Sequence, residues 1–237
     1  MPIDFSFSQE VEDARLMMRG FLQDTVKPAF AALQADKDAQ RADWSALVKS
    51  LRQKAKAQGF WLPHMPQDVG GMGLGVTALA AVSAEAAKIP MGPYIINAQA
   101  PDEGNMHTLY HFATDYQREH FLKPLLEGTV RSCFSMTEPD VAGSDPTLIQ
   151  TSAVEEGDEW VINGHKWFTS GAEGADFAIV IARTDPDAEI PQARNSAFIV
   201  PTNTPGFEII RDVETMGGRH NHPEIKYTDV RVPKTHL

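Results

Sequence analysis

The sequence is poor in cysteine, in long apolar runs and in basic charge. Its one cysteine, Cys133, excludes an internal disulfide and suits a reducing compartment. No segment approaches the run of about 18 apolar residues that a membrane helix requires. The first residues include acidic side chains and lack the basic and apolar regions of a secretory leader, so we expect a cytoplasmic protein that does not enter the membrane.

Charge and histidine spacing exclude two further classes of function. The net charge is −11, whereas proteins that bind the nucleic-acid backbone are normally basic, so we expect no nucleic-acid partner. The acidic residues are dispersed, which favours solubility and leaves room for an anionic ligand held by local donors. His107 and His111 are spaced for one helical face, but no third ligand is apparent, so we expect no metal site.

Residues 1–128 carry the patterns of helices. Ser8 precedes an apolar stripe that Lys27-Pro28 should end or kink. A second stripe runs from Trp44 to Ala55, and an alanine-rich stretch over 76–88 predicts a third helix. Thr114 to Gln117 has the pattern of a capping box before another apolar segment. This half of the chain is therefore predicted to be all helical.

After Gly128 the periodicity changes to that of short strands separated by turns. Asn163-Gly164 is a strong two-residue hairpin signal, because both residues tolerate positive φ, and Lys166–Ser170 would be the strand that follows it. The sequence therefore predicts an α+β protein: an all-α domain over 1–128 and a small β-barrel or sandwich over 129–237. The predicted strands are 130–137, 151–155, 159–162, 166–170, 177–184, 196–201, 207–211 and 224–232.

Two segments of the β region could carry chemistry. Residues 134–145, FSMTEPDVAGSD, form a strand that runs into a tight turn, which would present N–H groups and hydroxyls to a planar ligand. Residues 162–171, INGHKWFTSG, would place Trp167 and Thr169 on one face of a strand. Taken separately, each segment is more simply explained as an ordinary polar turn or as a core tryptophan beside a surface threonine.

Together, TEPDVAGSD and INGHKWFTSG resemble the acyl-CoA dehydrogenase family. The similarity continues through residues 59–75, 117–129 and 216–233, so it covers practically the whole chain in the order typical of that family. The resemblance implies an FAD-dependent enzyme that removes hydrogens from the α and β carbons of an acyl-CoA thioester and passes electrons to an electron-transferring flavoprotein.

The resemblance also implies the residues of a flavin site. Thr137 would donate to the pyrimidine edge of the ring, Trp167 would pack against the ring, and Thr169 would bond near its N5 atom. Gly143 and Ser144 would face the flavin phosphates and the pantetheine of the substrate, so Ser144 is also a substrate-binding candidate. The expected cofactor-binding residues are Phe134, Met136, Thr137, Gly143, Ser144, Trp167 and Thr169. For Glu138 we favour a structural role over that of a catalytic acid.

Family members continue into a C-terminal four-helix domain that carries the catalytic carboxylate, and we expect this chain to lack that domain. No catalytic residue is therefore expected within it, and we expect weak flavin binding and no turnover by this chain alone. Its partner would be a second copy or a complementary C-terminal chain. Two other interpretations stay open: a flavoenzyme of the same fold with a non-CoA substrate, and a non-catalytic partner or scaffold chain.

Overall fold

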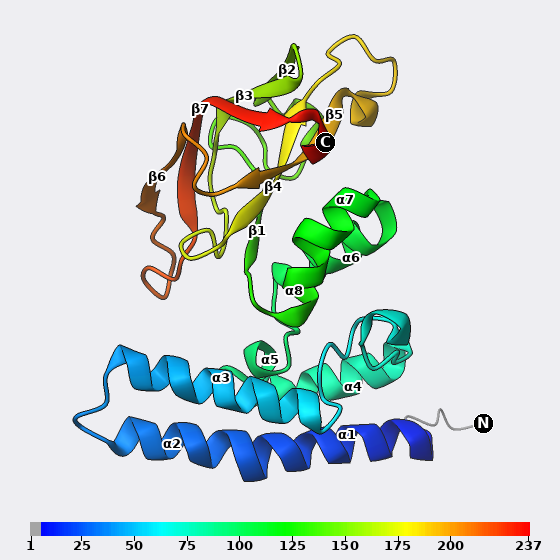
Figure 1. Ribbon diagram of the computed structural model, residues 1–237, viewed down its shortest axis with the longest axis vertical. Helices are drawn as coiled ribbons and strands as arrows, with labels where there is room; N and C mark the ends of the chain where they lie inside the picture. The colour runs from blue at the N-terminus through cyan, green and yellow to red at the C-terminus, as the bar shows by residue number, and fades with distance from the viewer. Residues whose placement is uncertain (1–5) are drawn as a thin grey trace. The chain divides into compact units, whose positions relative to one another are not determined.

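A computed structural model describes residues 6–237, which form two compact units (Figure 1). Among the described residues, unit 1 comprises residues 6–103 and unit 2 residues 104–237. Each unit is described by itself. The predicted domain boundary at 128/129 lies further along the chain than this division, because the helices between 104 and 128 pack within unit 2, and it stays a prediction.

Unit 1 is helical, as its periodicity predicts. Its helices enclose a core that includes Met18, Leu22, Leu51 and Val82, all of them buried. The glycine-rich loop after Trp61 folds back on itself, because the N–H groups of Met72 and Gly73 donate to carbonyls earlier in the loop. The helices are α1 (Gln9–Phe21), α2 (Lys27–Ala35), α3 (Arg41–Ala57), α4 (Val76–Ala86) and the short α5 (Gly92–Ile95).

Lys27-Pro28 was expected to end or kink the first helix, and α1 ends at Phe21, before these residues. A π-helical turn over Leu22–Val26 joins α1 to α2, and the N–H of Lys27 donates to the carbonyl of Leu22, five residues earlier. This wider turn accommodates a proline, which lacks an N–H and whose ring would clash with the carbonyl four residues before it. The same device recurs over Arg118–Leu122, directly before Pro124.

Unit 2 combines short helices with one sheet. Helix α6 (Asp102–Phe112), which begins at the boundary, is followed by α7 (Asp115–Gln117) and α8 (Lys123–Glu127). The predicted capping box is confirmed: the Thr114 hydroxyl accepts from the N–H of Gln117, whose side chain accepts from the N–H of Thr114. Short 3-10 turns lie at Gln67–Val69 in unit 1 and at Pro146–Leu148, Pro191–Arg194 and Lys234–His236 in unit 2.

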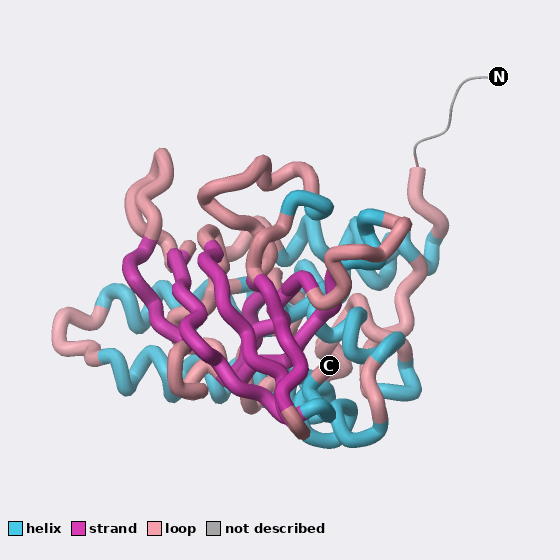
Figure 2. Tube along the Cα trace, turned by 90° about the horizontal axis from the view of Figure 1, so that it is seen from above, coloured by secondary structure: helices cyan, strands magenta, loops and turns pink. Residues whose placement is uncertain are grey.

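The seven strands of unit 2 form a single curled sheet (Figure 2). Its path is β1-β4-β2-β3-β7-β6, and β5 pairs with β4. The pairing of β1 with β4 is parallel. The strands are β1 (Ser132–Ser135), β2 (Ser152–Glu156), β3 (Glu159–Lys166), β4 (Phe177–Arg183), β5 (Asn195–Pro201), β6 (Phe207–Asp212) and β7 (Pro223–Pro233).

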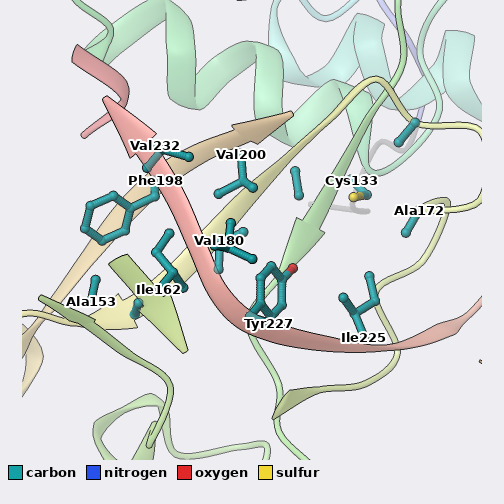
Figure 3. Close-up of a cluster of buried hydrophobic side chains, with 14 residues drawn as sticks. Cys133, Ala153, Ile162, Ala172, Val180, Phe198, Val200, Ile225, Tyr227 and Val232 are labelled. Carbon is teal, nitrogen blue, oxygen red and sulfur yellow. The ribbon is translucent and has the colours of Figure 1, made fainter. Parts of the chain in front are cut away.

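The concave side of the sheet holds the core of unit 2. Figure 3 shows Phe198, Val180, Ile162 and Tyr227, which come from different strands and belong to one buried cluster. Cys133 belongs to this cluster and is fully buried, so it is a core thiol. Helices followed by one curled sheet confirm the predicted α+β class.

The hairpin predicted at Asn163-Gly164 is wrong. Strand β3 passes straight through these residues and pairs with β7 around a β-bulge. The Asn163 side chain donates to the Asp229 carboxylate (3.0 Å) and accepts from its N–H (2.9 Å), which ties the bulge to β7. The glycine serves a close approach instead of a turn, because a Cβ on Gly164 would lie 2.2 Å from the Thr151 hydroxyl oxygen.

The strand predicted over 166–170 is also wrong. Strand β3 ends at Lys166, and Trp167 and Thr169 belong to the irregular segment that follows. The backbone turns sharply between them, because Phe168 has a φ of 48°. The two side chains consequently do not share one face of a strand.

An ion-pair cluster ties α1 to α4 in unit 1. The buried Glu85 carboxylate accepts from Arg15 (2.6 Å), Arg19 (2.7 Å) and Lys88 (3.0 Å). The Arg19 guanidinium, followed by Lys88 and Arg15, lowers the pKa of Glu85 to about 2 against the opposing effect of burial. Glu85 therefore stabilises unit 1 only while it is ionised.

We predict that Glu85→Gln destabilises the chain by about 2 kcal/mol at pH 7, because three cations lose their carboxylate while partial exposure screens them. The folded pKa is lowered, so the difference should be complete above the ordinary pKa of 4.5 and should shrink as the pH falls toward 2. Urea unfolding at several pH values measures it. An equal difference at pH 7 and pH 3 would contradict this account.

Gly164→Ala should destabilise the chain by about 2–3 kcal/mol, because the added methyl group meets Thr151 in a packed sheet. Gly104→Ala is the matched control. A Cβ there meets nothing within 4 Å on helix α6, and alanine favours helix by up to about 1 kcal/mol. Thermal unfolding of both variants tests the comparison, and equal loss in both would rule out the steric explanation.

Candidate functional site

Three segments of unit 2 are joined where strands β1 and β3 end and β7 begins. The Trp167 N–H donates to the Thr137 carbonyl (3.0 Å), and the Thr137 hydroxyl donates to the Trp167 carbonyl (2.9 Å). The Thr169 N–H donates to the Pro223 carbonyl (3.0 Å). The two sequence signatures, 30 residues apart, are therefore bonded to each other and to the start of β7.

A buried ion pair between Glu138 and Lys166 holds the first signature from the interior of unit 2. The Glu138 carboxylate accepts from Lys166 (2.9 Å) and from the N–H groups of Gln150 (2.8 Å) and Thr151 (2.9 Å). The Lys166 ammonium also donates to the Met136 carbonyl (2.7 Å). Glu138 is only 3% exposed and Lys166 is fully buried, which is compatible with the structural role favoured for Glu138.

Electrostatics keeps both members of this pair in their bonded state. Burial would raise the pKa of Glu138, but hydrogen bonds from Thr151 and Gln150 and the charge of Lys166 outweigh it and leave that pKa below its usual range. Burial lowers the pKa of Lys166, and the Glu138 carboxylate opposes this. These additional hydrogen bonds are consistent with both charged side chains being buried.

Most of the predicted site residues remain accessible at this end of the sheet. Phe134, Met136, Thr137 and Trp167 are half-buried, whereas Gly143 and Ser144 lie on the exposed turn that follows TEP. A Cβ on Gly143 would lie 3.4 Å from the Thr137 methyl group, so the turn folds back toward Thr137. Within residues 6–237, the N–H of Thr137 has no hydrogen-bond acceptor, which leaves one main-chain donor available to a ligand.

Thr169 lies differently from the other six. Its side chain is fully buried, and its hydroxyl lies 3.2 Å from that of Ser135. Ser135 in turn accepts from the Tyr227 hydroxyl (2.8 Å) inside the core. Burial raises the pKa of Tyr227, so this phenol stays protonated as a donor. The Thr169 hydroxyl is therefore turned toward the core.

The residues on either side of Thr169 face outward, and neither was predicted from the sequence as a site residue. Phe168 is 41% exposed. Ser170 is half-buried, and its hydroxyl lies 2.7 Å from Nδ1 of His222. Strict alternation along a strand would turn Thr169 toward the same face as Trp167. The positive φ of Phe168 breaks this alternation and changes the direction in which Thr169 points. No sequence signal marks that conformation, because phenylalanine rarely adopts it.

A shallow groove of about 440 Å³ is lined in part by Glu138, the carboxylate partner of Lys166. Its lining carries both signs of charge, so it selects no single class of ligand. The polar lining residues are Glu138, Asp140, Gln150, Thr151, Asn163, His165, Lys226 and Thr228.

Comparison with known proteins identifies the family. The model of the acyl-CoA dehydrogenase N-terminal domain matches residues 8–129, and that of the acyl-CoA dehydrogenase middle domain matches residues 133–230. The chain belongs to the acyl-CoA dehydrogenase family. The resemblance read from TEPDVAGSD and INGHKWFTSG is thereby confirmed.

Individual relatives agree with this assignment. The probable acyl-CoA dehydrogenase FadE2 of Mycobacterium tuberculosis is 40% identical over 99% of this chain. Human acyl-CoA dehydrogenase family member 11 is 40% identical over 81% of this chain and 25% of its own length. A solved structure of a candidate acyl-CoA dehydrogenase from Mycobacterium abscessus has a TM-score of 0.87 and 34% identity over 98% of this chain.

The chain spans only part of these relatives. It covers 59% of the FadE2 sequence and 60% of the Mycobacterium abscessus chain. Of the helices within residues 6–237, none has the length and apolarity to cross a membrane. Clusters of three or more His, Cys, Asp or Glu that could hold a metal ion are likewise missing from the described part of the chain.

We predict that Lys166→Met destabilises the chain by about 3 kcal/mol or more, because it leaves the Glu138 carboxylate buried without its cation. The double variant Glu138→Gln with Lys166→Met should recover part of this loss, because a neutral amide costs less to bury than a carboxylate. Urea unfolding of the two single variants and the double variant gives the coupling free energy. Strict additivity would show that the pair does not act as a unit.

Proposed function

We propose that the chain provides the flavin-ring site of an FAD-dependent dehydrogenase that acts on an acyl-CoA thioester. The observation that carries this proposal is the joining of the TEP and WFT segments at Thr137 and Trp167. This junction brings the available main-chain N–H of Thr137 beside half-buried aromatic side chains at one end of the sheet. Family membership supports the same reaction class.

The donor set suits a flavin. A planar, electron-accepting ring needs apolar surface against its face and donors at its pyrimidine edge. Trp167, Phe134 and Met136 are the accessible apolar candidates, and Thr137 has the available N–H. Gly143 and Ser144 lie on an exposed turn, where N–H groups could meet phosphate or pantetheine oxygens. Thr169 would support this site from the core side.

Bound FAD would supply a hydride acceptor to the site. The Thr137 N–H would stabilise negative charge that develops at the pyrimidine edge, since a fixed donor in a dry site needs no reorganisation. Trp167 and Phe134 would exclude water from that edge. The rigidity behind Thr137 comes from Lys166 and Glu138, which hold the strand end from the interior.

The carboxylate that removes the α-proton is proposed to lie in the part of the relatives that this chain does not span. Electrons would pass to an electron-transferring flavoprotein. The chain would work as a homo-oligomer or with a complementary chain that supplies the base. By itself it should bind flavin weakly and should not oxidise acyl-CoA.

The test is a titration of the 237-residue chain with FAD, followed by quenching of flavin fluorescence. Thr137→Val should weaken binding about fivefold, because it removes the bond to the Trp167 carbonyl and loosens the joined segments. Thr184→Val is the matched control, since its hydroxyl bonds to Ser196 at a remote position. Failure of the unmodified chain to bind FAD up to millimolar concentration would refute the proposal.

Addition of an acyl-CoA to the FAD-loaded chain tests the position of the base. The visible flavin band should persist, because no group able to remove the α-proton is expected among these residues. Bleaching of the band by acyl-CoA would place a base within this chain and would overturn that part of the proposal.

A further inference from the structure

Strand β6 forms an open edge of the sheet of unit 2. It stands at the end of the sheet path and, within residues 6–237, pairs with β7 alone (Figure 1). Residues 208–211, which make up its centre, are all exposed. An edge strand carries a row of main-chain N–H and carbonyl groups without partners, so another strand can pair with it.

Two further strands, β1 and β5, also have a single neighbour, and both are covered. The side chain of Asn105, on helix α6, donates to the Cys133 carbonyl in β1 (3.1 Å). Nδ1 of His236 bonds the Ile199 carbonyl in β5 (2.8 Å), and residues 198–200 are buried. In the described part of the chain, β6 is therefore the edge to which a strand from outside can add.

A β-bulge in β6 accompanies two exposed isoleucines. Ile209 pairs with Ile225 of β7 and Arg211 pairs with Glu224, so Ile210 is an extra residue that has no partner in β7. The exposed fractions of Ile209 and Ile210 are 42% and 45%. Adjacent β-branched side chains at an edge suit contact with the side chains of a neighbouring strand.

Opposite charges flank the two isoleucines. Glu208 precedes them, is exposed and takes part in no ion pair within residues 6–237. Arg211 follows them, and its Nε–H donates to the Glu224 carboxylate (2.6 Å). The Arg211 side chain is still 62% exposed, and its guanidinium has further N–H groups, so it can receive a second carboxylate.

The order Glu-Ile-Ile-Arg is self-complementary in an antiparallel pair. About a two-fold axis between Ile209 and Ile210, Glu208 of one copy lies opposite the partner's Arg211. Each Ile209 then lies opposite an Ile210, and every contact occurs twice because the interface is isologous. Opposite charges that face each other across two strands stabilise the pair, whereas like charges destabilise it. A strand with another order of charges would therefore fit this edge less well.

We propose that two copies of this chain associate through their β6 strands, which pair antiparallel and continue the sheet across a two-fold axis. The inference does not depend on the proposed function, because the pairing needs neither flavin nor acyl-CoA. The assembly closes as a dimer, since each copy offers one open edge. One strand of six residues from each copy buries less than the roughly 1,200 Å² of a stable interface, so the association is weak and sensitive to salt.

Charge reversal tests this pairing, with sedimentation velocity of the 237-residue chain from micromolar to millimolar concentration as the measurement. Glu208→Lys and Arg211→Glu should each weaken the dimer about tenfold, because two opposite-charge pairs become two like-charge pairs. In an equimolar mixture of the two variants, both pairs again join opposite charges, so the dimer should form as it does in the unmodified chain. Glu189→Lys makes the same charge change in the exposed loop after β4 and is the matched control.

Support requires a dimer that depends on concentration, its weakening in both single variants but not in the control, and its recovery in the mixture. A monomer across the whole concentration range would overturn the inference. Unchanged association in the single variants would assign the contact to another surface and would also overturn it. Weakening without recovery in the mixture, read together with the thermal midpoint of each variant, would show an effect on folding and would count against the pairing. Failure of the chain to bind FAD would refute the proposed function alone.

Discussion

The buried ion pair of Glu138 and Lys166 connects the parts of unit 2 on which the candidate site depends. Lys166 closes strand β3, and Glu138 begins the turn after β1, so one contact fixes the ends of two strands that are not neighbours in the sheet. The carboxylate also accepts from the N–H groups of the two residues just before β2, and the ammonium donates to the Met136 carbonyl. Burying two charges is costly, and these additional bonds are what offset the cost.

Because the strand ends are fixed, the accessible hydrogen-bonding groups and aromatic side chains lie together at one end of the sheet. Thr137 and Trp167 bond to each other, and the segment after Trp167 bonds to the start of β7. Inside this junction, Tyr227, Ser135 and Thr169 form a chain of hydroxyl groups in the core. Outside it lie the aromatic side chains and the pair of Ser170 and His222. The same short segment thus faces the core with Thr169 and faces outward with its two neighbours, because Phe168 turns the backbone.

Local patterns predicted the secondary structure well where nearby residues decide it. The capping box at Thr114, the helix over Trp44 to Ala55 and most strand positions follow from contacts within a few residues. Prediction failed where distant residues compete. Asn163-Gly164 has the local preference of a turn, but Asp229 and Thr151, far along the chain, hold it in an extended strand with a bulge. Lys27-Pro28 was expected to end or kink a helix, and the local form of that interruption, a π-helical turn over Leu22–Val26, appears only in the structure.

The sequence by itself determined the order of helices before strands, the family and the two signatures, because periodicity and short motifs are written in neighbouring residues. Only the tertiary structure decided which side chains face outward from those signatures. That choice depends on a single backbone angle at Phe168 and on hydrogen bonds that join the segment to Pro223, Asn221 and His222, about 50 residues later in the chain. Contacts across such separations leave no local pattern, so the inward direction of Thr169 and the pairing of Ser170 with His222 emerge only once the sheet has closed.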